Sequence, residues 1–300
     1  MNIANESELD QFIKEYPEIN MLEILMPDMN GIVRCKRIPR GEFGTFFRHG
    51  VKGPASTTLL NVRGEFCDEV DFAGLEGDPD KLIHPIANTL APITWLKSDT
   101  AQVLATFTEL DGSAALFDSR NILIKALQPL KAMNLKPIVA TELEFYLLKN
   151  GEGNVPEPLL GKIPGTQIDQ PGTQYAMPED LWDNDAFLED VRKACEVQNV
   201  PMTTVHSEFS PGQFEINLHH VDDPVSACDH AILLKRIVKG VPGSMAWRRL
   251  LWRSPSWMFL VVVCMSTSVY MTQRVRIFLQ IQAPLMCRQY RTSCDTLLEV

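Results

Sequence analysis

Four glutamates in two separate apolar segments are the residues of this sequence best suited to chemistry. Glu142 and Glu144 lie two positions apart in residues 137–148, an apolar run typical of a buried strand, so both side chains point to the same face. Glu208 and Glu215 flank a Ser-Pro-Gly break, which predicts a hairpin that brings them together across its turn. Carboxylates are rarely buried unpaired, and like charges repel. The four glutamates therefore predict a site for a hard divalent cation, Mg²⁺ or Mn²⁺, bound through oxygen.

A plainer interpretation treats these glutamates as ordinary outward-facing strand residues, because charged side chains are usually exposed. Three histidines, His206, His219 and His220, also flank the predicted hairpin. A single histidine beside a metal site is more often a core or supporting residue than a ligand, and we expect that here.

Length and composition indicate a globular protein of about two domains. The 300 residues are 45% hydrophobic and 22% charged, with a formal net charge of −10. The polar, acidic N-terminus predicts no signal peptide, and no run approaches the ~20 apolar residues of a membrane span. Seven cysteines without paired spacing predict reduced thiols, and hence a cytoplasmic location.

Periodicity and turn signals predict an α+β chain. The Asn30-Gly31 pair marks a hairpin turn, and Asp118 or Ser119 is a helix N-cap. Residues 151–179, rich in Gly and Pro, predict a long loop. The remaining expectations are strands at 19–26 and 32–38 and helices at 6–16, 119–133, 182–197 and 223–239.

Two motifs, in this order along the chain, resemble the metal-binding strands of the glutamine synthetase family. The first is E-x-E-F-Y at 142–146, and the second is the segment from His206 to Asn217, which ends in G-Q-x-E-I-N. The earlier segment D-x-N-G-x-x-R-x-K-x-I-P, at 28–39, resembles the small β-grasp domain with which that family begins. The resemblance implies a β-grasp domain at 1–112. It also implies the first half of a glutamine synthetase catalytic domain, an antiparallel sheet with helices, at 113–240.

The resemblance also implies a reaction and its partners. ATP phosphorylates the side-chain carboxylate of glutamate, and ammonia or an amine displaces phosphate from the γ-glutamyl phosphate. Glu144, Glu208 and Glu215 would hold one metal, Glu142 would contribute to the nucleotide-side metal, and His220 falls where the family contacts the nucleotide base. Family members assemble as homo-oligomeric rings.

Within the family, the Gly-Asp-Pro-Asp sequence at 77–80 and the spacing of Trp95 from Ala101-Gln102 look similar to the γ-glutamyl-polyamine ligase branch. Ammonia-using members carry an Asp-Gly-Ser-Ser motif in the first domain. Residues 53–57, Gly-Pro-Ala-Ser-Thr, stand in that region instead. The resemblance therefore favours a primary amine or polyamine over ammonia as the acceptor.

The composition changes after Gly240. Residues 1–240 hold 21 Lys and Arg against 36 Asp and Glu, a formal charge of −15, whereas residues 241–300 hold seven Arg, no Lys and two acids. Family members read His-Gly-Met here. The codons CAT GGC ATG GCG, read one base late, encode Met-Ala-Trp, which is the sequence at 245–247. The same one-base shift of the reading frame accounts for the sequence to the end of the chain. We interpret 241–300 as an out-of-frame tail, poorly packed and without a consistent apolar face.

Three interpretations of the whole chain follow from this tail. The first is a family ligase by ancestry that is inactive or nearly so as written, because the downstream metal ligands and phosphate-binding arginines have no counterpart. The second is a complete enzyme whose sequence contains an error. The third is a truncated binding or regulatory protein with an Arg/Trp-rich interaction tail. Of these we favour the first, with no nucleic-acid or membrane partner.

Overall fold

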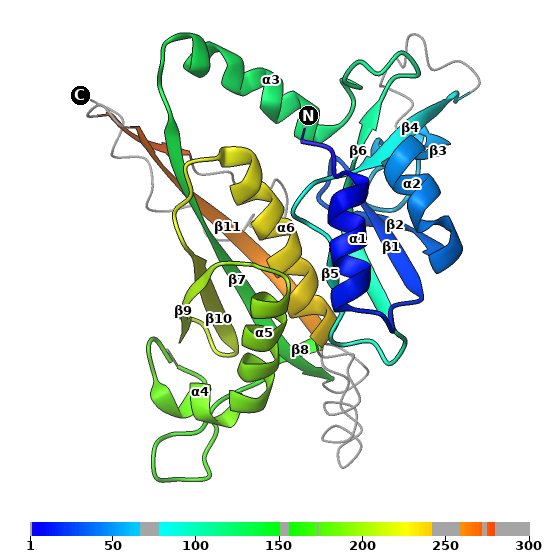
Figure 1. Ribbon diagram of the computed structural model, residues 1–300. Helices are drawn as coiled ribbons and strands as arrows, with labels where there is room; N and C mark the ends of the chain where they lie inside the picture. Colours follow the sequence, from blue (N-terminus) through cyan, green and yellow to red (C-terminus); the bar gives the residue numbers. More distant parts are fainter. Residues whose placement is uncertain are drawn as a thin grey trace.

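The structure is a computed structural model that describes residues 2–66, 78–150, 156–172 and 174–241, together with strands at 259–271 and 275–279. The described elements form two sheets, each accompanied by helices, and Figure 1 shows the two groups side by side. The predicted mixture of helices and strands is thereby confirmed. The tail at 241–300 is described only at Val241 and in the two strands.

The first sheet is mixed, with strand order β2-β1-β6-β4-β3 and β5 paired to β6. Its central strands β1 and β6 run parallel, and its other pairs are antiparallel. The predicted hairpin and opening helix are confirmed to within about two residues. The elements are α1 (Glu6–Glu15), β1 (Met21–Pro27), β2 (Val33–Pro39), a 3₁₀ turn (Arg40–Glu42), α2 (Phe43–His49), β3 (Val51–Pro54), a 3₁₀ turn (Ala55–Thr58), β4 (Asp80–Pro85), β5 (Ala91–Pro92) and β6 (Thr100–Thr108).

The second sheet is antiparallel throughout its described pairs, with order β12-β11-β7-β10-β9 and β8 paired to β7. Its long strand β7 lies between β11 and β10, with the helices α5 and α6 nearby (Figure 1). The elements are α3 (Ser119–Ala132), β7 (Pro137–Asn150), β8 (Pro156–Pro158), α4 (Pro178–Asp183), α5 (Asp185–Val197), β9 (Met202–Ser207), β10 (Gln213–Leu218), α6 (Pro224–Gly240), β11 (Phe259–Met271) and β12 (Val275–Leu279).

Helix starts in the second group follow local chemistry. Asp118 accepts a hydrogen bond from the backbone N–H of Arg120 and caps α3, as the sequence predicts. Asp223 caps α6 in the same way, by accepting from the N–H of Val225. The prediction of a single helix at 182–197 is wrong at its N-terminal end. The chain forms the short α4 and then α5, because Asn184 interrupts the helix and its amide donates to the carbonyl of Asp180.

Two further expectations need correction. The predicted loop at 151–179 contains β8, which pairs with the end of β7, and α4 begins inside it at Pro178. The tail also contains regular structure that the sequence did not lead us to expect. Strand β11 pairs along β7 from Phe259 to Met271. The apolar, β-branched sequence Phe-Leu-Val-Val-Val favours an extended strand. Such a strand can pair with the backbone groups on the edge of β7 opposite β10, and this explains why part of the tail is regular although the sequence argument expected it to be poorly packed.

Alternation along the second sheet separates a core face from a polar face. Leu143, Phe145 and Leu147 of β7 are buried together with Phe214 and Ile216 of β10. Phe145 stacks on Phe214 with ring centroids 6.0 Å apart. These residues pack against apolar side chains of α5 and α6, such as Phe187, Val191, Leu234 and Ile237. The intervening residues of β7, including the glutamates, therefore point to the opposite face.

A buried carboxylate joins the two groups of elements. Glu23 of β1 is 5% exposed and pairs with Arg37 of β2 and with Arg236 of α6. Arg236 Nε also donates to Gln102 Oε1 at 2.7 Å, and Gln102 donates to Gln198 at 2.8 Å. Each side chain of this network is paired with another. Removing one of them would leave its partner buried without a hydrogen bond or an opposite charge. The first sheet is thus held against α5 and α6.

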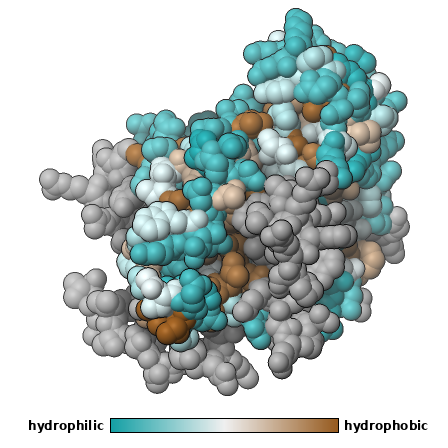
Figure 2. Space-filling view, turned by 90° about the horizontal axis from the view of Figure 1, so that it is seen from below, coloured by the Kyte–Doolittle hydropathy of each residue, from teal (hydrophilic) through white to brown (hydrophobic). Residues whose placement is uncertain are grey.

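On the face shown in Figure 2, hydrophilic residues cover most of the coloured area and hydrophobic residues form smaller patches between them. Among the described residues, no helix is both long and apolar enough to span a membrane.

Candidate metal centre

The predicted hairpin of the metal-binding segment is confirmed. Strands β9 and β10 are antiparallel and meet at a turn over residues 210–213, where the N–H of Gln213 donates to the carbonyl of Ser210 at 3.0 Å. Pro211 and Gly212 occupy the central positions of this turn, and Gly212 has φ of +74°. A Cβ there would approach the carbonyl oxygen of Leu147 to 3.0 Å. Glycine is thus required both by the backbone conformation and by the close approach of β7.

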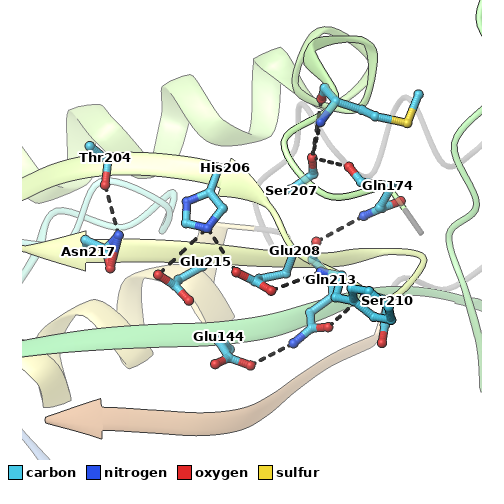
Figure 3. Close-up of polar contacts among 12 residues, drawn as sticks. Glu144, Gln174, Thr204, His206, Ser207, Glu208, Ser210, Gln213, Glu215 and Asn217 are labelled. Atoms are coloured by element: carbon cyan, nitrogen blue, oxygen red, sulfur yellow. Dashed lines mark hydrogen bonds and ion pairs between the residues drawn. The ribbon is translucent and has the colours of Figure 1, made fainter.

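Strand register places three functional side chains in one row across three strands. Glu144 of β7 lies opposite Glu215 of β10, and Glu215 lies opposite His206 of β9. Glu208 follows directly after β9. Its Oε1 lies 3.0 Å from His206 Nε2, and Glu215 Oε1 lies 3.9 Å from the same nitrogen. Figure 3 shows His206, Glu208, Glu215 and Glu144 on the same side of the sheet.

His206, Glu208 and Glu215 can each offer a ligand atom to one ion, because these atoms lie within 4.8 Å of one another. The side chains of Glu208 and Glu215 are 18% and 13% exposed. The two glutamates are therefore mostly, but not completely, withdrawn from solvent. Histidine was expected to be a supporting residue, yet the structure places His206 among the candidate ligands. Its spacing of two residues from Glu208 on a strand was the signal that could have found it.

Electrostatics in this cluster favour a bound cation. Burial, followed by the charge of Glu142, raises the pKa of Glu215 to about 7, with Glu208 and Glu144 adding to the effect and His206 opposing it. Burial and Glu208 also raise the pKa of Glu144, although the hydrogen bond from Gln213 opposes this. A divalent cation would relieve the repulsion, and carboxylate oxygens with one imidazole are a donor set that suits Mn²⁺ or Mg²⁺. The residues present thus fit such an ion.

The surrounding residues hold the ligands in place. Gln213 Nε2 donates to Glu144 Oε2 at 2.7 Å, and the backbone N–H of Phe209 donates to Glu208 Oε2 at 2.9 Å. Gln174, which is 1% exposed, donates to the carbonyl of Gln213 and accepts from the N–H of Gly212. The ring of Tyr175 meets His206 edge to face, with centroids 5.8 Å apart. The loop before α4 therefore clamps the turn of the hairpin.

Two predicted site residues are not among the grouped candidate ligands, although the charge of one of them, Glu142, acts on Glu215. Glu142 is in the next row of the sheet, opposite Asn217, whose Oδ1 is buried and makes no hydrogen bond within the described residues. His220, which the resemblance assigns to the nucleotide base, is exposed and lies beyond the end of β10. The structure brings Glu208 and Glu215 together, sets Glu144 beside them and leaves His220 outside.

Comparisons with known proteins show what the chain as a whole is similar to. Residues 116–246 match the family "Glutamine synthetase, catalytic domain". The chain is 33% identical over 244 residues to gamma-glutamylputrescine synthetase of Escherichia coli (strain K12), covering 79% of this chain and 50% of that protein. It is 27% identical over 234 residues to glutamate–isopropylamine ligase of Pseudomonas sp, covering 77% and 49%. The chain spans about half the length of these relatives.

Solved structures give the same fold. The complex of GmaS with ADP has a TM-score of 0.65 at 17% identity, covering 88% of this chain and 55% of that one. Glutamine synthetase of Plasmodium falciparum has a TM-score of 0.63 at 15% identity, covering 90% and 54%. The resemblance to the glutamine synthetase family is confirmed by the match of residues 116–246 to its catalytic-domain model and by the similar relatives. Within that family the chain is similar to a γ-glutamyl-polyamine synthetase, as the motifs predicted.

The cluster predicts divalent metal binding that depends on individual carboxylates. We expect weak Mn²⁺ binding, which Glu144→Ala and Glu215→Ala each abolish, because few ligands remain to hold the ion. His206→Ala should weaken binding about tenfold, since one donor of several is lost. Electron paramagnetic resonance of unbound Mn²⁺ during a titration measures this. Glu157→Ala, at an exposed position of β8 on the same sheet, is the matched control. Equal affinity in all variants would contradict the site.

Stability without metal should depend on pH through Glu215. Its pKa of about 7 exceeds the ordinary value of 4.5, so the folded chain retains a proton that the unfolded chain has lost. Stability should therefore fall as pH rises from about 4.5 to about 7 and stay lower above that.

Glu215→Gln removes this ionisation. In the presence of a chelator at pH 8, the variant should melt roughly 2–4 °C above the parent. The loss of the charge should stabilise the folded chain by about 1 kcal/mol, a value reduced because the carboxylate is partly exposed to solvent. At pH 4.5 the two should melt together. Calorimetry across this range, with Glu157→Gln as the exposed control, measures the difference. A variant that is less stable than the parent at pH 8 would show that the repulsion is absent.

Proposed function

We propose that this chain is, by ancestry, an ATP-dependent ligase that joins the γ-carboxylate of glutamate to an amine or ammonia through γ-glutamyl phosphate. The observation that carries the proposal is the cluster of His206, Glu208 and Glu215 beside Glu144, on the segment that matches the glutamine synthetase catalytic domain. We further propose that the chain as written does not turn over, because residues 241–300 are out of frame.

The finer domain plan belongs to the same proposal. Residues 1–112 would be the family's β-grasp domain, which accords with the parallel central pair β1 and β6 flanked by antiparallel strands. Residues 113–240 would be the first half of the catalytic domain. The family match ends at residue 246, close to the change in composition after Gly240. Two observations support the interpretation of residues 241–300 as an out-of-frame tail. They are this change in composition and the one-base shift of the reading frame that accounts for the sequence.

The chain's own residues would act on the glutamate and phosphate side. Glu144, Glu208 and Glu215 would hold one divalent ion, with His206 as an additional or alternative ligand. When bound, such an ion supplies charge neutralisation for the transferring phosphoryl group. Gln213 would keep the Glu144 carboxylate turned towards the cluster, and Gln174 would keep the turn from moving away.

The nucleotide side of the site is where this chain differs from the family. Glu142 would contribute to a second divalent ion, and His220 would approach the base of ATP. The family's downstream histidine, glutamate and phosphate-binding arginines have no counterpart in the sequence of residues 241–300. A Mg²⁺ or Mn²⁺ site normally needs several fixed ligands, so Glu142 alone would hold its ion weakly. Assembly into the family's ring would also suffer.

Turnover should be undetectable for the chain as written. Removing one preorganised electrostatic group commonly costs about 10²- to 10³-fold in rate, and several are missing here. Restoring one base near the Val241 codon should recover ATP-dependent γ-glutamyl amide formation. Product formation by the two proteins, measured by mass spectrometry, decides this. Robust turnover by the chain as written would show that the missing groups are replaced by others.

The restored protein should prefer a primary amine or polyamine to ammonium. The region of the family's Asp-Gly-Ser-Ser motif holds Ser56, whose hydroxyl donates to Asp78 Oδ2 at 2.5 Å. Asp78 comes from the Gly-Asp-Pro-Asp segment, so the two segments on which the amine preference is argued meet in the fold. Initial rates with putrescine and with ammonium chloride, each under saturating glutamate and ATP, measure the preference. A clear preference for ammonium would contradict it.

A further inference from the structure

A second pocket lies away from the metal centre, between the first sheet and the end of α6. It has a volume of about 360 Å³. Its walls come from the β1–β2 hairpin, from the segment after β5 and from the last turns of α6. The lining residues are Gly31, Ile32, Val33, Trp95, Lys235, Arg236, Lys239 and Gly240. Because α6 packs against the core face of the second sheet, this pocket is separated from the glutamates by the sheet itself.

The charge of this pocket is opposite to that of the chain around it. Three of its described lining residues, Lys235, Arg236 and Lys239, are cationic, and none is acidic. Residues 1–240 as a whole carry a formal charge of −15. Burial and the neighbouring charge of Lys239 lower the pKa of Lys235, which Asp28 opposes. A concentration of like charge of this kind is relieved by a bound anion.

The three cations are only partly committed to other partners. Arg236 uses Nε and Nη2 for Gln102 and Glu23, and its guanidinium lies 5.8 Å from the centre of the Trp95 ring. Lys235 donates to the carbonyl of Gly31 at 3.0 Å, which uses one of its three N–H groups. Lys239 is exposed at the rim. A simple helix-end role explains one lysine in the last turn, but it does not explain a cavity with three cations.

We propose that this pocket binds a compact, multiply charged anion, a phosphate ester or a small polycarboxylate. Lys235 and Lys239 would contact its charged groups, and Arg236 would face it from the junction with Glu23. Trp95, Ile32 and Val33 form an apolar wall that accommodates a short carbon body. A bound anion would connect the β1–β2 hairpin to α6 and so stabilise the contact between the two groups of elements.

Isothermal titration with inorganic pyrophosphate and, separately, with tricarballylate tests this site on the full chain. Protein and buffer are freed of divalent ions on a chelating resin, so binding through a divalent ion at the glutamates is excluded, and ionic strength is matched with sodium chloride. We expect saturable binding of at least one probe. Lys239→Gln and Lys235→Gln should each raise its Kd about tenfold. At equal concentration the probe should also raise the melting temperature of the parent more than that of Lys239→Gln.

Two controls make the outcome specific. Lys131→Gln removes an exposed lysine from the last turn of α3, as Lys239→Gln does from α6, and should leave Kd unchanged. Arg248→Gln with Arg249→Gln tests whether the basic tail is responsible, and this pair should also leave Kd unchanged. Absence of binding, equal Kd in the Lys239 variant, or loss of binding in the tail variant alone would overturn the proposal. Lys239 is exposed, so its variant should fold even if the Lys235 variant does not.

Discussion

Crowding of like charge on one face of a β-sheet is the constraint on which the rest of this structure depends. Glu142, Glu144 and Glu215 project from neighbouring strands, and Glu208 joins them from the end of β9. Burial, together with the charges of Glu142, Glu208 and Glu144, raises the pKa of Glu215. Only the imidazole of His206 and the amide of Gln213 offset this among the side chains of the cluster. A bound cation would relieve this repulsion.

The fold can maintain this arrangement because the opposite face of the same strands is a well-packed core. Phe145 and Phe214 are almost completely buried against α5 and α6, and they lie one residue away from Glu144 and Glu215. A shift of register by one residue would exchange the two faces and bury the carboxylates. The packing that stabilises the sheet therefore also determines which side chains meet at the metal centre.

Charge is handled differently where the first sheet meets α6. Glu23 is buried, yet it has two arginine partners, and one of them, Arg236, also borders the basic pocket. The glutamate cluster is an excess of negative charge and the pocket an excess of positive charge, with α6 and the second sheet between them. Two sites of opposite charge on opposite faces of one sheet would bind ligands without competing.

Much of this molecule could be predicted from local sequence. The alternation in residues 137–148, the Pro-Gly turn before Gln213 and the cap at Asp118 depend on neighbouring residues alone, and all three are confirmed. Glu208 and Glu215 could be paired because a short hairpin leaves little choice of register.

Contacts between distant segments could not be predicted in this way. The register of β9 with β10 places His206 opposite Glu215, and Gln174 holds the hairpin from more than thirty residues away. The pairing of β11 with β7 and the meeting of Lys235 with Gly31 likewise join distant parts of the chain. Residue types and local spacing were enough to single out the four glutamates and the strands that carry them. Which side chains share a site depends on strand register and on helix packing between distant segments, and only the folded chain shows that.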